Sequence, residues 1–283
     1  MNVHVRIAAV AATVLLTLPV YARRTAASAQ TFGEEPSREL TVSAFRDAEI
    51  AGFLNALDAK LSAPSGRTER SEDASGVFAE FTRRLQAGRL SAAQESQVLA
   101  HLTAISRVMP EQSAAIDGAR HLISALTVGK IAPEIDGHDL DGAPMRLSRY
   151  RGKVVALLFS GEWCGICRAE YPYERFLLDL YKEWPLAVLT VNSDADAATA
   201  KRAYTARGLS LPSWFDGDGH GGPRGPIASA WHVSGWPTSY LIDGAGVIRF
   251  INVRQEDLLK GVRQLLLEQA HSAAAAARRG HSQ

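Results

Sequence analysis

Residues 163–167, Trp-Cys-Gly-Ile-Cys, decide the fold, because they stand between an apolar run and an amphipathic segment. The apolar run, Val154–Phe159, predicts a buried strand, and the segment from Cys164 to about Lys182 predicts a helix. Cys164 and Cys167 are the only cysteines among the 283 residues. Two thiols one helical turn apart can close a small disulfide ring and open it again by thiol exchange. Such a short loop constrains little of the unfolded chain, so we expect a chemical role and not a structural one.

The position of the two thiols assigns their roles. A thiol attacks a disulfide as the thiolate, and a helix N-terminus lowers the ordinary cysteine pKa of about 8.5. Cys164 would start the helix and follow the bulky Trp163, so we predict that it is the exposed, attacking nucleophile. Cys167 would lie one turn inside the helix, shielded, and would resolve the mixed disulfide by attacking Cys164.

Composition narrows the class of protein. The chain is of near-average composition and long enough for one or two domains with a real core. A net charge of +1, with no basic patch, argues against nucleic acid as a partner. Two cysteines are too few to staple a small secreted domain, so the core must carry stability and leave the pair free for redox work.

The first 29 residues are typical of a secretory signal. A short basic start at His4 and Arg6 precedes the apolar run Ile7–Val20, and small residues follow at two candidate cleavage points, 20–22 and 27–29. The sequence therefore predicts export to an oxidising, periplasmic or otherwise extracytoplasmic compartment. An uncleaved membrane anchor is the alternative, although the run is shorter than the roughly 20 residues of a spanning helix.

Residues 40–127 predict a helical N-terminal region whose role is open. Apolar residues recur at three- and four-residue steps over 40–61, 77–87, 91–109 and 111–126. Ser91 is a candidate cap for the third helix, with Gln94 as its capping-box partner. The apolar faces favour packing over a ligand site.

From about residue 131 to 270 the pattern changes to strands that alternate with helices, which indicates an α/β domain. We expect strands over 154–159, 186–191, 239–242 and 247–251, helices over 195–207 and 256–270, and a loop over 208–226. Val128–Asp141 reads as a connector. Residues 271–283 read as a disordered tail.

Residues 163–168 resemble the Trp-Cys-x-x-Cys-Lys/Arg signature of thioredoxin-fold oxidoreductases. The whole segment 131–270 resembles the exported TlpA/ResA branch of the AhpC/TSA-type redoxins. Further matching motifs are Ile131–Pro133, Leu147–Lys153, Gly235–Thr238 and Leu241–Ile248. The resemblance implies a thioredoxin-like fold, a central mixed sheet flanked by helices, and leaves out the helical region.

The resemblance also implies further site residues. A cis peptide between Trp236 and Pro237 would expose backbone beside the disulfide for a partner chain, with Trp163 and Trp236 lining the same surface. In this branch a glutamate at the position of Glu170 tunes the cysteine pKa values, so it is a candidate for proton transfer. The alternative for Glu170 is a solvated helix carboxylate. The buried aspartate of thioredoxin itself is replaced by Leu158.

The resemblance implies a protein disulfide reductase that acts on disulfide-containing proteins. Its only cofactor would be the Cys164–Cys167 disulfide, and a membrane-bound thiol donor would recycle it. Three alternatives stay open. A thiol peroxidase would show a Pro-x-x-x-Thr/Ser-x-x-Cys motif, which is incomplete here. A zinc or copper carrier would need further ligands such as His220 and His232. A non-enzymatic role would make the redox domain a scaffold for partner binding by the helical region.

Overall fold

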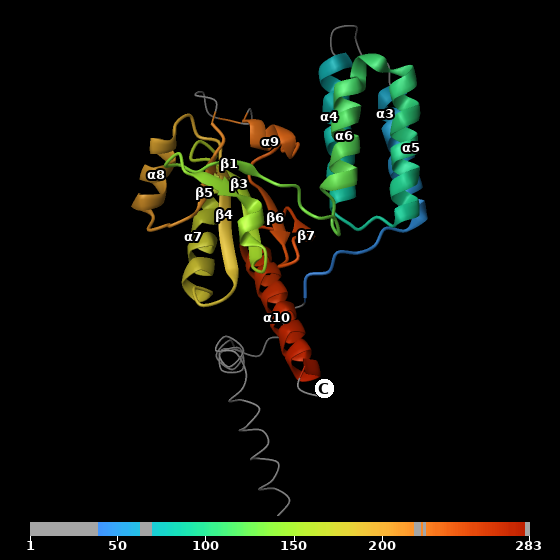
Figure 1. Cartoon of the computed structure of the whole chain (residues 1–283). Coiled ribbons are helices and arrows are strands. Elements are labelled where there is room, and N and C mark those ends of the chain that lie inside the picture. The colour runs from blue at the N-terminus through green and yellow to red at the C-terminus, as the bar shows by residue number, and fades with distance from the viewer. Residues whose placement is uncertain (1–38, 63–69, 218–221, 223–224, 281–283) are drawn as a thin grey trace, which may run out of the picture.

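The computed structural model describes residues 39–62, 70–217, 222 and 225–280. Two parts lie side by side, a helical bundle built from α3 to α6 and a sheet domain that holds the remaining elements (Figure 1). The expected signal segment, residues 1–29, lies outside the described residues. Within the described part of the chain, no helix is long and apolar enough to cross a membrane.

The sheet domain is built on five strands in the order β5-β4-β3-β6-β7. Their bounds are Ser213–Phe215 for β5, Leu186–Asn192 for β4, Val154–Ser160 for β3, Thr238–Ile242 for β6 and Ile248–Ile251 for β7. The strands β3, β4 and β5 are parallel, whereas β6 and β7 run antiparallel to their neighbours. This mixed sheet with flanking helices is the thioredoxin-like fold expected from the sequence.

The central strand β3 is buried along its whole length, because both faces of the sheet are covered. Successive side chains of a strand point to opposite faces. Val155, Leu157 and Phe159 accordingly join one core cluster with Trp231, and Leu158 joins the other with Leu177 of α7. Leu158 is therefore an ordinary core residue at the position where thioredoxin carries its aspartate.

The helices of the sheet domain are α7 (Gly165–Leu180), α8 (Ala197–Ala206), α9 (Pro226–Ala230) and α10 (Gln255–Gly280). The buried side chains of α7, α8 and α10 share one core cluster, on one face of the sheet, and α9 contributes to the cluster on the other face. Pro172 lies inside α7.

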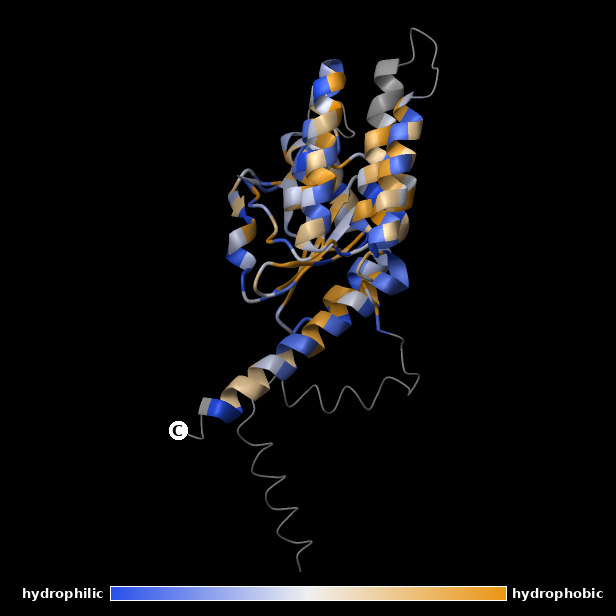
Figure 2. Ribbon diagram, turned by 90° about the vertical axis from the view of Figure 1, so that its right-hand side faces the viewer, coloured by the Kyte–Doolittle hydropathy of each residue, from blue (hydrophilic) through white to orange (hydrophobic). Residues whose placement is uncertain are grey.

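The helical bundle consists of α3 (Asp47–Ser62), α4 (Arg70–Gln86), α5 (Ala92–Val108) and α6 (Ser113–Ala125), with a 3₁₀ turn, η1 (Pro110–Gln112), before α6. Hydrophilic and hydrophobic residues alternate around these helices (Figure 2). Their apolar sides form a core of their own that includes Ile50, Leu85, Leu102 and Ile116. The capping box of Ser91 and Gln94 is present, which confirms that prediction.

The expected helical start at residue 40 was wrong, since α3 begins only at Asp47. The chain before it is extended: Arg89 donates its N–H to the Ser43 carbonyl, and Phe45 donates to the Arg89 carbonyl. Leu40 donates its backbone N–H to the Gln264 side chain of α10 (3.1 Å). These partners are distant in sequence, so the local periodicity could not reveal them.

Three further expectations needed correction. The connector 128–141 and the residues after it form a hairpin of β1 (Asp136–His138) and β2 (Pro144–Arg146), followed by a 3₁₀ turn, η2 (Leu147–Tyr150). The loop 208–226 contains the edge strand β5. The tail expected to be disordered from residue 271 continues α10 as far as Gly280.

Polar side chains tie the bundle to the sheet domain. The buried Gln86 of α4 donates from Nε2 to the Leu126 carbonyl (3.2 Å) and to the Tyr240 hydroxyl of β6 (3.4 Å). Lys130 forms an ion pair with Glu95 of α5 (2.6 Å). Leu122 and Leu126 extend the core of the sheet domain toward the bundle. The two parts are therefore packed together and not merely tethered.

Candidate active site

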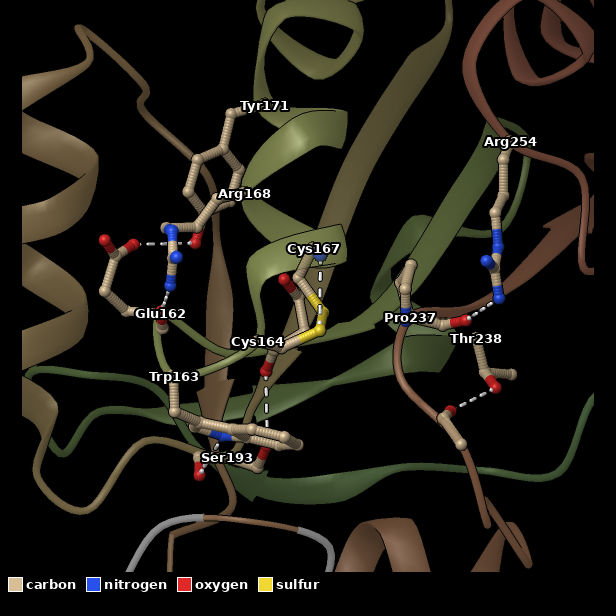
Figure 3. The surroundings of a disulfide bond; sticks show 12 residues. Glu162, Trp163, Cys164, Cys167, Arg168, Tyr171, Ser193, Pro237, Thr238 and Arg254 are labelled. Atoms are coloured by element: carbon tan, nitrogen blue, oxygen red, sulfur yellow. Dashed lines mark hydrogen bonds between the residues drawn. A yellow bond between two sulfur atoms is a disulfide. The ribbon is translucent and has the colours of Figure 1, made fainter.

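The two cysteines form a disulfide at the start of α7, with their Cα atoms 5.2 Å apart (Figure 3). Cys164 is the N-cap residue, and its Sγ accepts the backbone N–H of Cys167 at 3.2 Å. Cys164 keeps 8% of its surface exposed, whereas Cys167 is fully buried. The first turn of a helix offers unpaired N–H groups and a positive dipole end, which favour a thiolate at Cys164.

A hydrogen-bonded network fixes the turn that leads into the disulfide. Glu162 donates its backbone N–H to the buried carboxylate of Asp194 (2.7 Å), and its own carboxylate pairs with Arg207 (2.8 Å). The Glu162 carbonyl accepts a hydrogen bond from Arg168 (2.5 Å). The hydroxyl of Tyr171 donates to the Glu162 carboxylate. Burial raises the pKa of Tyr171, so this hydroxyl keeps its proton. Sequence reasoning missed this network, because Asp194 and Arg207 lie 32 and 45 residues from Glu162 in the sequence.

The expected substrate-binding residues lie together on one side of the disulfide. Trp163 is 46% exposed and donates from its indole N–H to the Ser193 carbonyl (3.1 Å). Its ring lies 5.9 Å from that of Trp236. Pro237 follows in a cis peptide bond, as the resemblance implied, and is drawn beside the disulfide in Figure 3. Ile166 adds a 58% exposed apolar side chain at the start of α7. The disulfide therefore opens onto an apolar surface.

Two hydrogen bonds to backbone carbonyls stabilise the loop that carries Pro237. Arg254 donates to the Pro237 carbonyl (2.8 Å), and the hydroxyl of Thr238 donates to the Gly235 carbonyl (2.8 Å). The indole N–H of Trp236 is buried and has no partner among the described residues. No local pattern in the sequence indicated that Arg254 would donate to the Pro237 carbonyl, which lies 17 residues before it.

Glu170 is buried, with 5% of its surface exposed, so the reading as a solvated helix carboxylate was wrong. One of its oxygens, Oε2, accepts the backbone N–H of Gln255 at the start of α10 (2.8 Å). The other, Oε1, is buried without a partner in the described part of the chain. An uncommitted buried acceptor three residues after Cys167 can take part in proton transfer.

Sequence reasoning overlooked a second buried carboxyl, that of Glu174. It lies one turn beyond Glu170, and its Oε2 is buried with no partner among the described residues. Burial, together with the nearby Glu170, raises the pKa of Glu174 to about 8. A signal was present, since Glu170, Glu174 and Leu177 share the i, i+4, i+7 spacing of one helix face.

In the part of the chain that it describes, the structure offers no set of candidate ligands for the alternative in which the protein carries zinc or copper. Within the described ranges, no group of three or more His, Cys, Asp or Glu residues is placed to hold a metal ion. His220 lies outside the described residues. His232 packs instead against His121, with ring centroids 5.1 Å apart.

Comparison with known proteins gives the same picture of the sheet domain. Residues 128–251 match the model of the AhpC/TSA family. Thiol-disulfide oxidoreductase ResA of Geobacillus kaustophilus is 34% identical over 128 residues, which are 45% of this chain and 70% of that protein. The chain belongs to the ResA-like thiol-disulfide oxidoreductases.

Other known proteins are similar over the same region. ResA of Bacillus anthracis is 31% identical over 139 residues, 48% of this chain and 76% of that protein. Among solved structures, the thioredoxin domain of a thiol-disulfide oxidoreductase from Bacteroides vulgatus is 24% identical and covers 50% of this chain and 99% of that one, with a TM-score of 0.43. The identity with the ResA relatives makes the chain a thiol-disulfide oxidoreductase.

Proposed function

We propose that this protein reduces disulfides in partner proteins outside the cytoplasm. The observation that carries the proposal is the place of Cys164, which caps α7 and accepts the N–H of Cys167 at 3.2 Å. In the reduced protein the same N–H and the helix dipole would stabilise the Cys164 thiolate. No cofactor is needed beyond the Cys164–Cys167 pair itself.

The proposed reaction runs in two exchange steps. The Cys164 thiolate attacks one sulfur of the partner's disulfide, and the partner's other sulfur leaves as a thiolate and takes up a proton. Cys167 then loses its proton, attacks Cys164, and releases the partner's second sulfur as a thiol. The partner gains two electrons and two protons, and the enzyme is left with the Cys164–Cys167 disulfide.

Glu170 is proposed as the group that moves the proton of Cys167. Its buried, unpartnered Oε1 and its position one turn after Cys167 support this role. Trp163, Trp236 and Pro237 are proposed to bind the partner, because the exposed Trp163 ring lies 5.9 Å from the Trp236 ring and Pro237 is drawn beside the disulfide in Figure 3. Apolar and aromatic groups of this kind are typical of protein-binding surfaces.

The proposed place of work is the periplasm or another extracytoplasmic compartment. The signal-like residues 1–29 support it, whether the segment is cleaved or kept as an anchor. In such an oxidising compartment the Cys164–Cys167 disulfide must be reduced again after each turnover. We propose a membrane-bound thiol protein as that electron donor.

The test is a redox titration of the full chain in glutathione buffers, with thiol trapping and mass measurement. We expect a reversible two-electron transition of the Cys164–Cys167 pair with a potential in the low range, nearer to thioredoxin at about −270 mV than to the oxidant DsbA at about −120 mV. A potential at the oxidising end would contradict the reductase and indicate a disulfide donor. Failure to form the intramolecular disulfide would contradict both.

A further inference from the structure

A groove of about 490 Å³ separates the helical bundle from the loop that carries Pro237. One wall comes from α4, with Thr82, Arg83 and Gln86. The other comes from residues 232–238 together with Ile251, Asn252 and Arg254. A neighbouring groove of about 290 Å³ shares lining residues of both walls, so the two volumes are parts of one cleft. The matched family region, residues 128–251, does not include α4. The bundle thus adds a wall beside the redox site.

The groove opens next to the reactive disulfide. Its lining includes Trp236, Pro237 and Thr238. Pro237 and Thr238 are drawn on the same side of Cys164, and Arg254 reaches the Pro237 carbonyl from above in this view (Figure 3). When the disulfide of a partner protein reaches Cys164, the partner's residues next to its cysteine must contact a surface beside the site. The groove is such a surface.

The charge of the lining has one sign. Among its described residues, Arg83 and Arg254 are the ionised side chains, and there is no aspartate or glutamate. Glu80 forms ion pairs with both Arg83 and Arg84, so this trio keeps one net positive charge. Burial and the neighbouring His121 lower the pKa of His232, so that side chain adds no charge at neutral pH.

The floor of the groove is polar but uncharged. The hydroxyl of Tyr240 keeps its proton, since burial raises the Tyr240 pKa to about 12, and it accepts a hydrogen bond from Gln86. Arg83 is 60% exposed at the rim, where its guanidinium can turn toward a ligand. The lining therefore offers hydrogen bonds at its base and positive charge at its edge.

We propose that this groove binds an acidic segment of the disulfide-containing protein substrate, next to the cysteine that Cys164 attacks. The proposal rests on the proposed function and adds a substrate preference to it. Carboxylates on the bound segment would meet Arg83 and Arg254, while its backbone would lie along Trp236–Thr238. Complementary charge of this kind raises association rates and selects partners.

The test uses the reduced full chain and two pairs of peptides, each peptide carrying one disulfide. Within a pair, one peptide has aspartates beside the cysteine and the other has asparagines at the same positions. One pair has these residues before the cysteine, and the other pair has them after it. At low salt we expect kcat/KM for one aspartate peptide to exceed that of its asparagine partner by roughly fivefold, and the ratio to shrink as salt screens the charges.

Variants of Arg83 locate the effect. Arg83→Gln should bring the ratio close to one, and Arg83→Glu should invert it. Arg84→Gln is the matched control, because it removes the same charge from the trio but Arg84 does not line the groove, so it should lower the ratio less than Arg83→Gln does. A ratio of one in the native chain, or a ratio that Arg83→Glu leaves unchanged, would overturn the proposal.

The uncharged 2-hydroxyethyl disulfide separates this proposal from the proposed function. The native chain and the Arg83 variants should reduce it at the same rate, because it places no charge in the groove. If they do so while the peptide ratio is one, the acidic-segment proposal fails and the reductase stands. If the native chain reduces neither this disulfide nor the peptides, the proposed function itself fails.

Discussion

The two parts of the molecule bury different kinds of polar group. The helical bundle buries the uncharged side chains of Thr82, Gln86, Gln94 and Gln112. The sheet domain also buries carboxyls, those of Glu170, Glu174, Asp194 and Asp216. A buried carboxyl costs free energy unless it is well paired, so its presence needs a local reason. In the sheet domain the reasons differ from one carboxyl to the next.

Two of these carboxyls have clear structural work. Asp194 accepts the N–H of Glu162 and the side-chain amide of Asn192, and thereby holds the turn before the disulfide. Asp216 accepts the N–H groups of Ile227 and Ala228 at the start of α9. Glu170 and Glu174 each leave one buried oxygen unpartnered among the described residues. Unsatisfied buried carboxyls of this kind concentrate at functional sites, and these two lie on the helix that Cys164 begins.

The largest effect should come from the disulfide itself. Replacing Cys164 with Ser removes the nucleophile, and we expect turnover of a disulfide peptide to fall roughly a thousandfold or more. A Cys167→Ser variant should still attack its partner once but should stall as a mixed disulfide. Steady-state reduction rates and non-reducing gels check both results. Unchanged turnover in Cys164→Ser would mean that the chemistry lies elsewhere.

The next effect concerns pH and Glu174. Its pKa is raised from 4.5 to about 8, so the folded chain favours the neutral carboxyl. Its contribution to stability is full below about pH 4.5, declines as the pH rises, and is lost above about pH 8. Glu174→Gln removes this dependence. The free energy of unfolding of the variant, relative to that of the native chain, should therefore rise by on the order of 3 kcal/mol as the pH goes from 5 to 8.

Denaturant unfolding at several pH values measures the gain. Asp179→Asn is the matched control, since Asp179 lies on the same helix with its side chain 75% exposed. Its difference from the native chain should stay nearly constant over this range. A Glu174→Gln difference that is equally flat would show that the buried carboxyl is ionised at neutral pH.

A smaller effect should follow from cutting the polar link between the two parts. Gln86→Leu leaves the Leu126 carbonyl and the Tyr240 hydroxyl without their donor, which should lower the free energy of unfolding by about 1–3 kcal/mol. Gln97→Leu, at an exposed position of α5, is the control and should change little. Equal losses in both variants would argue that the link is not a stabilising contact.

The smallest effect belongs to the bundle alone. Ser91→Ala removes the side-chain half of the α5 capping box and should cost about 1 kcal/mol of stability. Reduction of 2-hydroxyethyl disulfide should keep its native rate. Ser96→Ala, at an exposed position of the same helix, should stay within about 0.5 kcal/mol of the native chain. A loss of activity in Ser91→Ala would link the bundle to the chemistry.

The sequence predicted those features that depend on neighbouring residues. Apolar continuity marked β3 and the capping box marked the start of α5. The cis peptide before Pro237 was implied by the resemblance of residues 235–238 to a family motif. Three-residue strands such as β5 carry too short a pattern to stand out from a loop. The extended start before α3 depends on Arg89 and Gln264, which no local pattern connects to it.

The residues of the candidate site also fall into those that the sequence predicted and those that depend on long-range packing. Cys164 and Cys167 were predicted from their spacing and their place between strand and helix, whereas Pro237 was predicted only through the resemblance to the family motif. The burial of Glu170 depends on Gln255, which is 85 residues away in sequence. Glu174 was missed because a charged letter on a helix suggests solvent, although its spacing from Glu170 and Leu177 pointed inward. Long-range packing, and not residue type, decided the state of both carboxyls.

The central claim is that Cys164, at the start of α7, is the attacking thiol. The most direct test is the alkylation of the reduced full chain with limiting iodoacetamide, followed by mass mapping of both cysteines. We expect Cys164 to react first, roughly tenfold faster than Cys167, because Cys164 caps the helix and keeps some exposure while Cys167 is fully buried. Equal rates, or faster modification of Cys167, would contradict the account.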